Sequence, residues 1–188
     1  MIAETKKQSG QGLLEAVFAI GIMLMVVSAI LALTTSNVIG QRQSELQVIG
    51  NNLAREGIEV ARNIRDSNWL SGRAWDTGLN GGSRALVDFN QITNSWSLDF
   101  SVLPGKDLLY LSNMGVYSHD ATSGLPSAFS RVVNFQSICQ NSVGEDAIRP
   151  DCLSGEQKIG FKLRSVVTWQ ESSRSRQVAV ESLMYEWK

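Results

Sequence analysis

The hydrophobic pattern of the chain begins with one long apolar run. From Leu13 to Leu33 the only ionisable side chain is Glu15. A helix of about 20 residues rises about 30 Å, which matches the hydrocarbon core of a bilayer. The run therefore predicts a helix that is long enough to span a membrane.

Beyond Leu33 the sequence becomes more polar, but it keeps a helical period and contains no proline up to Asp66. Apolar residues recur at intervals of mostly three and four, which predicts one buried stripe. The stripe consists of Leu46, Ile49, Leu53, Ile58, Ala61 and Ile64. We expect one helix from Leu13 to Asp66, about 80 Å long at the standard rise, with a membrane half and an amphipathic half.

Three glycines, Gly40, Gly50 and Gly57, lie in the predicted helix beyond Leu33. Each costs about 1 kcal/mol relative to alanine, so each needs a reason. One reason is local bending of the helix, and the other is close packing against a neighbouring element. The sequence leaves both open.

The pattern after Trp69 changes from helical to extended. Residues 71–84 are rich in glycine and polar residues and predict a loop. Residues 96–102 and 161–169 alternate between apolar and polar side chains, which predicts strands with one buried face. The second of these is followed by a turn and a returning strand over 176–187, which completes a hairpin. Shorter candidate strands are Leu108–Leu111 and Phe129–Ile138.

Charges beside the apolar run indicate its orientation. Lys6 and Lys7 precede the run and only Arg42 follows soon after, which favours a cytoplasmic N-terminus and a domain on the other side. An ordinary secretory signal would have an apolar region of about 7 to 15 residues and an A-x-A-like cleavage site. A plain single-pass anchor leaves Glu15 unexplained, since a carboxylate costs about 2.5 to 3.5 kcal/mol at mid-membrane and less near the edge.

The stretch "SGQGLLEAVFAIGIM" resembles the prepilin signature of type IV pilins and secretion pseudopilins. In that family a leader peptidase cuts a short basic leader after a glycine, and the fifth mature residue is glutamate. Cutting after Gly12 would make Glu15 the third mature residue, whereas cutting after Gly10 makes it the fifth. The resemblance thus implies a leader over residues 1–10 and a mature chain that begins at Gln11. N-terminal methylation of Gln11 is also implied, although the family usually has phenylalanine there.

This register suggests a role for Glu15. Four helical steps rise about 6 Å, so the carboxylate lies one turn beyond the amine that cleavage frees. A neighbouring chain that brings its own amine to Glu15 would be favoured over other registers, because opposite charges attract strongly at an apolar edge. Glu15 is therefore expected to be an assembly group. The alternative is a glutamate that reaches the membrane interface and has no partner.

The resemblance also implies an α+β, pilin-like fold, in which a long N-terminal helix packs on a C-terminal antiparallel sheet. Residues 11–36 would form the transmembrane and assembly half of the helix. Residues 37–188 would form the globular domain together with the second half of the helix.

The two cysteines are Cys139 and Cys152. They fit a disulfide if this part of the chain leaves the cytosol, and two free thiols are the alternative. A bridge would close a loop of about a dozen residues and contribute about 3 kcal/mol. Many members of the family carry such a bridge around a surface loop. The enclosed "QNSVGEDAIRPD" is either a partner-facing loop or only stapled in place.

No sequence motif for catalysis is found, so we expect no enzyme activity and no cofactor. His119 and Asp120 form the best candidate pair, but they lie in a turn-rich segment without a nucleophile. Asp76 and Asn80 offer oxygen donors but fall far short of a calcium loop, so no metal site is predicted.

Net charge argues against a nucleic-acid binder, since the formal value is −1. Four basic residues near the final hairpin could form a cluster, but solvated charge is expected at a turn. They are Lys162, Arg164, Arg174 and Arg176. Nucleic acid is therefore an improbable partner.

Together these features predict a minor pilin or pseudopilin of a type IV pilus or related filament. Its partners would be other such subunits, a prepilin peptidase and a membrane assembly platform. It would sit in the cytoplasmic (inner) membrane as a single-pass protein before assembly into an extracytoplasmic filament. Within the family, a secretion pseudopilin and a competence pilin both remain possible. The alternative from another class is a monomeric, membrane-anchored binding domain or adhesin.

Overall fold

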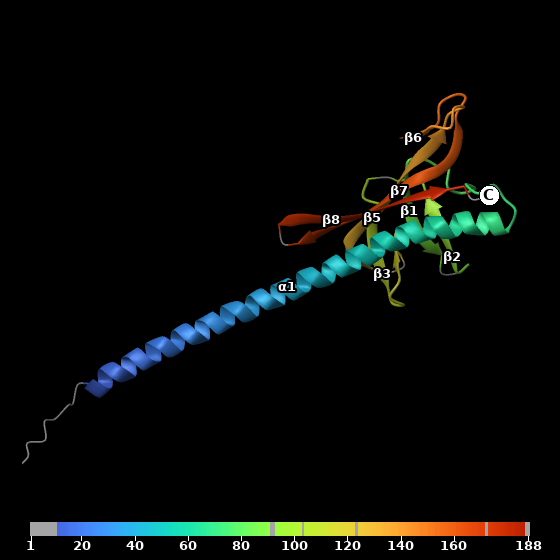
Figure 1. The fold of residues 1–188 in the computed structure, drawn as a ribbon. Helices are drawn as coiled ribbons and strands as arrows, with labels where there is room; N and C mark the ends of the chain where they lie inside the picture. Colours follow the sequence, from blue (N-terminus) through green and yellow to red (C-terminus); the bar gives the residue numbers. More distant parts are fainter. Residues whose placement is uncertain (1–10, 91–92, 103, 123, 172, 187–188) are drawn as a thin grey trace, which may run out of the picture. The chain divides into compact units, whose positions relative to one another are not determined.

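The structure is a computed structural model of the chain, and it describes residues 11–90, 93–102, 104–122, 124–171 and 173–186 (Figure 1). The chain divides into two compact units, Met1–Leu46 and Gln47–Lys188. One helix, α1 (Gln11–Leu70), contributes to both units. The strands are β1 (Arg84–Asn90), β2 (Ser95–Asp99), β3 (Leu108–Ser112), β4 (Tyr117–Ser118), β5 (Gly124–Gln140), β6 (Asp146–Arg149), β7 (Gln157–Glu171) and β8 (Arg174–Tyr185).

Helix α1 confirms the helical period, and it begins two residues before and ends four residues after the predicted bounds. Its C-terminal end is closed by Gly72, whose φ of 68° is the left-handed conformation that glycine favours after a helix. The Arg73 amide donates to the Asn68 carbonyl at 2.9 Å. The chain can therefore leave the helix at once and enter the loop that leads to β1.

The sheet is antiparallel and is organised around β5. One edge of β5 pairs with β7 from Phe129↔Trp169 to Gln140↔Gln157. The other edge pairs in turn with β3, β1 and β6. β7 also pairs with β8, which forms the predicted hairpin. β2 pairs with β1 and β4 pairs with β3, so these two short strands join the layer around β5 indirectly.

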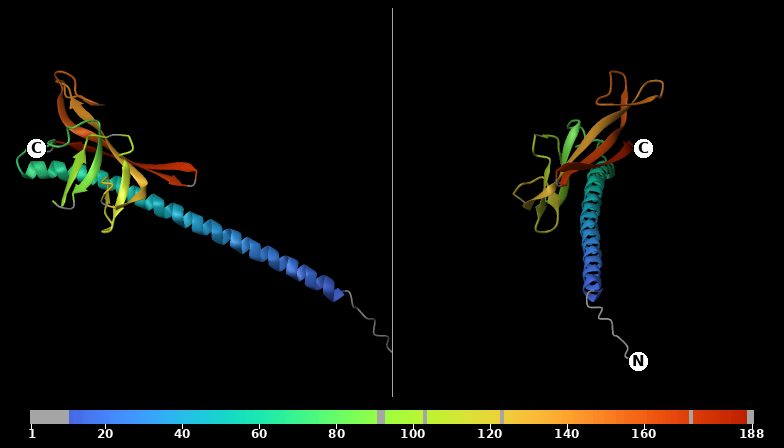
Figure 2. Two further views of the ribbon diagram at one scale, coloured as in Figure 1. Left: turned by 180° about the vertical axis from the view of Figure 1, so that it is seen from behind. Right: turned by 90° about the vertical axis from the view of Figure 1, so that its left-hand side faces the viewer.

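In the second unit, helix residues lie along one face of this sheet (Figure 2). Leu53, Ile58 and Ala61 of the predicted stripe are buried, and the other three members are partly buried. The core cluster is Ile58, Val60, Ala61, Leu79, Ala85, Val87, Val133, Phe135, Phe161, Leu163 and Met184. The coarse α+β prediction, a long helix packed on an antiparallel sheet, is confirmed.

Two of the three glycines that follow Leu33 in the helix are packing positions. A Cβ atom on Gly57 would lie 2.6 Å from Ser165 Oγ and 3.0 Å from Val133 Cγ2. A Cβ atom on Gly50 would lie 2.9 Å from the Trp169 ring. The helix and β7 approach closely because these residues have no side chain, whereas Gly40 has nothing within 4 Å of its Cβ position.

A buried ion pair connects the helix to the sheet. Arg131, on β5, is 0% exposed, and its guanidinium contacts Glu56 Oε1 at 2.7 Å. The same group donates to the carbonyls of Leu53 at 3.2 Å and Val87 at 3.0 Å. Arg131 therefore links α1, β1 and β5 at a position where the alternation of β5 would place an apolar residue.

Three strands were not predicted from the sequence: β1, β4 and β6. β1 begins at the last residue of the predicted loop, Arg84. The strand expected over 96–102 is also shorter, since β2 ends at Asp99. There the Asp99 carboxylate accepts a hydrogen bond from the Ser101 amide at 2.8 Å, and the chain turns away from β1.

Candidate functional site

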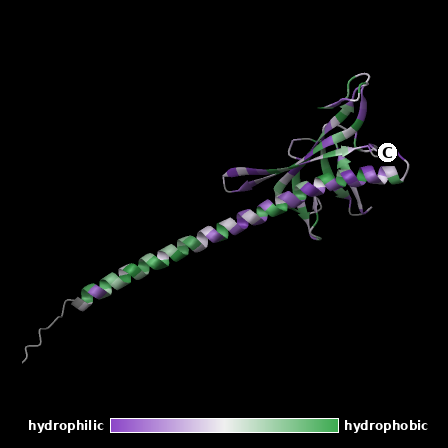
Figure 3. Cartoon of the chain, viewed as in Figure 1, coloured by the Kyte–Doolittle hydropathy of each residue, from purple (hydrophilic) through white to green (hydrophobic). Residues whose placement is uncertain are grey.

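The first unit is dominated by an apolar helical segment with no packing partner among the described residues. Figure 3 shows the first part of α1 as a mostly hydrophobic stretch. The large apolar side chains between Leu13 and Leu33 are all exposed. In the part of the chain that the structure describes, α1 is the one helix long and apolar enough to cross a membrane. A surface of this size is costly in water, because roughly 25 cal/mol is lost for each exposed apolar Å².

Hydroxyl groups in and just after this segment are satisfied within the helix. Ser28 Oγ donates to the Met25 carbonyl at 2.9 Å. Thr34 and Thr35 donate to the carbonyls four residues earlier, each at 2.9 Å. An unpaired hydroxyl is expensive in hydrocarbon, and these internal bonds make the segment compatible with lipid.

Glu15 lies one turn from the start of α1 and is exposed. No hydrogen bond or ion pair is formed by its carboxylate within the described residues. The described part of the chain is already helical at its first residue, Gln11, while Gly10 and the basic leader lie outside the described residues. The roles of Gly10, Gln11 and Glu15 in cleavage, methylation and assembly stay predictions.

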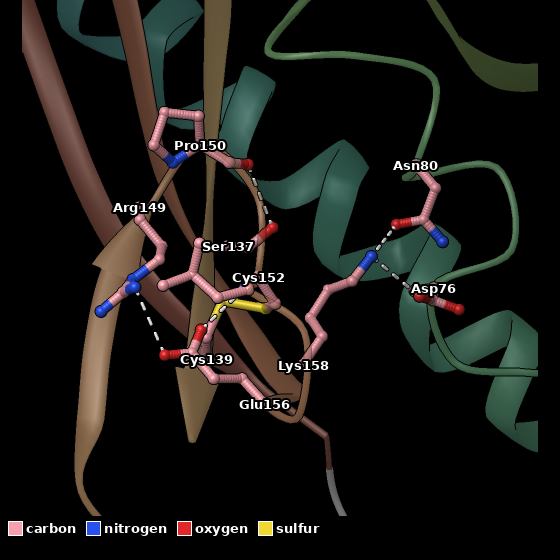
Figure 4. The surroundings of a disulfide bond; sticks show 10 residues. Asp76, Asn80, Ser137, Cys139, Arg149, Pro150, Cys152, Glu156 and Lys158 are labelled. Atoms are coloured by element: carbon pink, nitrogen blue, oxygen red, sulfur yellow. Dashed lines mark hydrogen bonds and ion pairs between the residues drawn. A yellow bond between two sulfur atoms is a disulfide. The ribbon is translucent and has the colours of Figure 1, made fainter. Parts of the chain in front are cut away.

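The two cysteines form a disulfide, which excludes the free-thiol alternative (Figure 4). Cys139 is buried near the end of β5, and Cys152 follows β6. Residues 139–156, which include the disulfide and the loop that it closes, are called the disulfide lobe. Arg149 pairs with Glu156 at 3.3 Å within this lobe. Glu156 lies close to both sulfur atoms, but bridged sulfurs are not the thiolates that bind metal ions.

The tip of the disulfide lobe is ordered by one side chain, Asn141. Its Oδ1 accepts from the amides of Val143 at 3.0 Å and Glu145 at 2.9 Å, and its Nδ2 donates to the Glu145 carboxylate at 3.0 Å. Val143 at the tip is 83% exposed. The bridge and this turn together hold the lobe in one conformation, which is what a staple requires and what a recognition loop would also use.

His119 and Asp120, the candidate catalytic pair, make structural contacts. His119 Nδ1 lies 3.1 Å from the Lys106 carbonyl and 3.2 Å from the Leu108 carbonyl, so this nitrogen carries the proton and donates. Burial, and then the charge of Arg131, lower the pKa of His119. Hydrogen bonds from Thr122 lower the pKa of Asp120. The imidazole is neutral at pH 7, and it connects the residue after β4 to the start of β3.

Asp76 and Asn80, the oxygen donors of the loop, face an ammonium group. Lys158 Nζ lies 3.3 Å from Asp76 Oδ2 and also contacts Asn80 Oδ1 (Figure 4). These two oxygens therefore fix the loop to β7.

The four basic residues of the final hairpin are largely paired with glutamates. Lys162 and Arg164 both contact Glu181, at 3.0 Å and 3.4 Å. Arg176 contacts Glu171 at 3.0 Å. This pairing leaves little uncompensated charge for a polyanion along the strands.

Comparison of the chain with protein-family models, with curated proteins and with solved structures gives no match. What is known at this point is the class of molecule: a long helix with an apolar, exposed first half, joined to an α+β unit that contains one disulfide.

Proposed function

We propose that this chain is a type IV pilin-like subunit, a minor pilin or pseudopilin, which polymerises through its N-terminal helix. The observation that carries the proposal is Glu15, a carboxylate with no partner among the described residues, near the start of an apolar, unpacked helical segment. The prepilin-like register around Gly10 and Gln11 supports it. So does the second half of the helix, which packs beneath a sheet.

The apolar segment would be buried both before and after assembly, in different surroundings. In the membrane the apolar side chains contact lipid, and in the filament they contact the same segment of neighbouring chains. The freed amine of a neighbour would pair with Glu15. Two unit charges at 4 Å interact by about 4 kcal/mol at an effective dielectric constant of 20, which is enough to select one register.

The proposed function is mechanical. The chain would have no turnover and no cofactor, and it would act with other subunits, a prepilin peptidase and a membrane assembly platform. Before assembly it would lie in the cytoplasmic membrane with residues 37–188 outside.

Mass spectrometry of the protein purified from its native membrane tests the cleavage step. We expect a chain that begins at Gln11, with or without one methyl group. Gly10→Ala should block cleavage, and Gly12→Ala is the matched control that should leave it intact. A chain that keeps its first ten residues would support the alternative, a monomeric tether for a binding domain.

Replacement of Glu15 tests the assembly step. Glu15→Ala should leave membrane insertion intact and strongly reduce incorporation into filaments. Glu45→Ala is the control, because Glu45 is an exposed carboxylate on the same helix outside the apolar segment. Equal incorporation of the two variants would contradict the proposal.

A further inference from the structure

Three side chains that can form a covalent cross-link meet beside the disulfide lobe. Lys158 Nζ, on β7, lies 3.3 Å from Asp76 Oδ2 and donates a hydrogen bond to Asn80 Oδ1 (Figure 4). A lysine amine can displace ammonia from an asparagine carboxamide when the two groups are held together and a carboxylate transfers the protons. A lysine in contact with both an asparagine and an aspartate therefore supplies every group that an intramolecular isopeptide bond requires.

The loop after α1 holds Asp76 and Asn80 in fixed positions. The Leu79 amide donates to the Asp76 carbonyl at 2.9 Å, and the Leu79 side chain is fully buried. The Asn68 side chain donates to two carbonyls of the loop, at 2.7 Å and 3.2 Å. After Asn80, Gly81 packs against an aromatic ring that leaves no room for a side chain. The carboxamide is thus presented to β7 by an ordered backbone.

The sheet and two aromatic side chains hold the amine in place. Lys158 pairs with Cys139 of β5 in the sheet. Its Nζ lies 4.9 Å from the centre of the Phe161 ring, and Trp75 packs on the same ring with centroids 5.4 Å apart. The side chains of Lys158 and Asp76 are only 28% and 21% exposed. A nucleophile held against its target reacts at an effective concentration far above any reached in solution.

We propose that Lys158 and Asn80 become joined by an isopeptide bond, with Asp76 as the catalytic residue that transfers the protons. Asp76 takes a proton from the Lys158 ammonium group, and the neutral Nζ attacks Asn80 Cγ. The Nζ–Cγ bond forms and the Cγ–Nδ2 bond breaks. Two protons pass from the lysine nitrogen to the departing nitrogen, which leaves as an ammonium ion, and Asp76 ends as the carboxylate that it was. The step involves no oxidation or reduction.

The bond would connect residues 78 positions apart in the sequence. It would close a ring that contains β1 to β6 and would tie the loop after α1 covalently to β7. The inference does not depend on the proposed function. A chain that keeps its first ten residues could carry the bond, and a chain without the bond could still polymerise, so the two proposals fail separately.

The Gly81 nitrogen is a competing nucleophile, because glycine leaves a preceding carboxamide open to attack by the backbone. That reaction also releases ammonia and gives a succinimide. The succinimide hydrolyses to aspartate or isoaspartate, and it joins no distant residues. A lower mass alone therefore does not identify the isopeptide bond, whereas a branched peptide does.

Mass spectrometry of the full chain, purified in detergent, is the test. We expect an intact mass that is lower by one ammonia molecule than the sequence from its observed N-terminus gives. Trypsin digestion after reduction should yield a branched peptide that joins residues 74–84 to Lys158. Lys158→Arg keeps the charge and should abolish both signals. Lys162→Arg is the matched control, because Lys162 contacts the Glu181 carboxylate at 3.0 Å.

The role of Asp76 is tested by the rate of bond formation, followed by pulse labelling during expression. Asp76→Asn should slow formation at least about 100-fold, the lower range for a positioned proton-transfer group. Incubation of this variant at a pH of about 10 should restore much of the rate, because base in solution then takes the proton from lysine. A side chain that acted only as a structural contact would not be replaced by base.

Three results would overturn the inference. A parent chain with the unlinked mass, and with peptide 74–84 recovered alone, would show that Lys158 makes only an ion pair. A loss of ammonia that persists in Lys158→Arg would assign the reaction to the Gly81 nitrogen. Formation at the parental rate in Asp76→Asn would refute the proton transfer through Asp76.

Discussion

The buried pair between Arg131 and Glu56 gives the sharpest prediction about stability. Glu56→Ala would leave a guanidinium that is 0% exposed with only two carbonyl partners. Breaking a fully buried pair from one side costs about 3 to 5 kcal/mol. The Glu56 side chain is 34% exposed, so part of its attraction is screened by water. We therefore expect a loss of about 2 to 3 kcal/mol.

The reverse deletion should cost less. Arg131→Met removes the buried charge and keeps a long apolar side chain, while Glu56 can turn towards water. The main penalty is the Val87 carbonyl left without its donor, about 1 to 2 kcal/mol. Adding Glu56→Ala to Arg131→Met should then change little, and the double-mutant cycle should show coupling of about 2 kcal/mol.

Urea unfolding of the full chain in detergent micelles, followed by tryptophan fluorescence, measures these differences. Trp169 is buried in the second unit and reports on its unfolding. The matched control is Glu59→Ala, which removes a partner of Arg62 in an exposed pair on the same helix and should cost less than about 0.5 kcal/mol. Equal losses for Glu56→Ala and Glu59→Ala would refute the reasoning.

Three further predictions concern the second unit. Gly57→Ala should lower the free energy of unfolding by about 1 to 2 kcal/mol, although alanine has the better helix propensity. Adding Ser165→Ala should recover part of this loss in urea unfolding. A double variant that is no more stable than Gly57→Ala alone would contradict the packing explanation. Replacing both Cys139 and Cys152 with alanine should cost about 3 kcal/mol, and a reductant should destabilise only the parent chain. Because burial lowers the pKa of His119, the contribution of His119 to the free energy of unfolding is complete above the unfolded pKa of about 6.5 and is lost as the pH falls. His119→Asn should therefore flatten the dependence of stability on pH below about 6.5. An unchanged dependence in this variant would contradict this role of His119.

The sequence predicted the elements whose pattern is long and regular. The continuous apolar run over Leu13–Leu33, the helical period beyond it up to Asp66 and the period of two in the final hairpin each extend over enough residues to predict one kind of element. β4 and β6 have two and four residues, too few for any period to show. They are defined by pairing with β3 and β5, which is information that only the folded sheet contains.

The functional and structural residues likewise divide into those that stand out in the sequence and those that do not. Glu15 and the two cysteines stand out in the sequence, because each is chemically unusual in its surroundings. Arg131 does not stand out, since an arginine in a strand normally faces solvent and its burial depends on Glu56, 75 positions away.

The composition of the core has a consequence for biosynthesis. The face of α1 around Ile58 and Ala61 is covered by Phe161, Leu163 and Met184, from the last two strands of the chain. The contact of Arg65 with the Tyr185 carbonyl likewise joins residues 120 positions apart. Nearly the whole chain must therefore be synthesised before this face leaves water, and until then the nascent helix exposes an apolar face that is prone to aggregation.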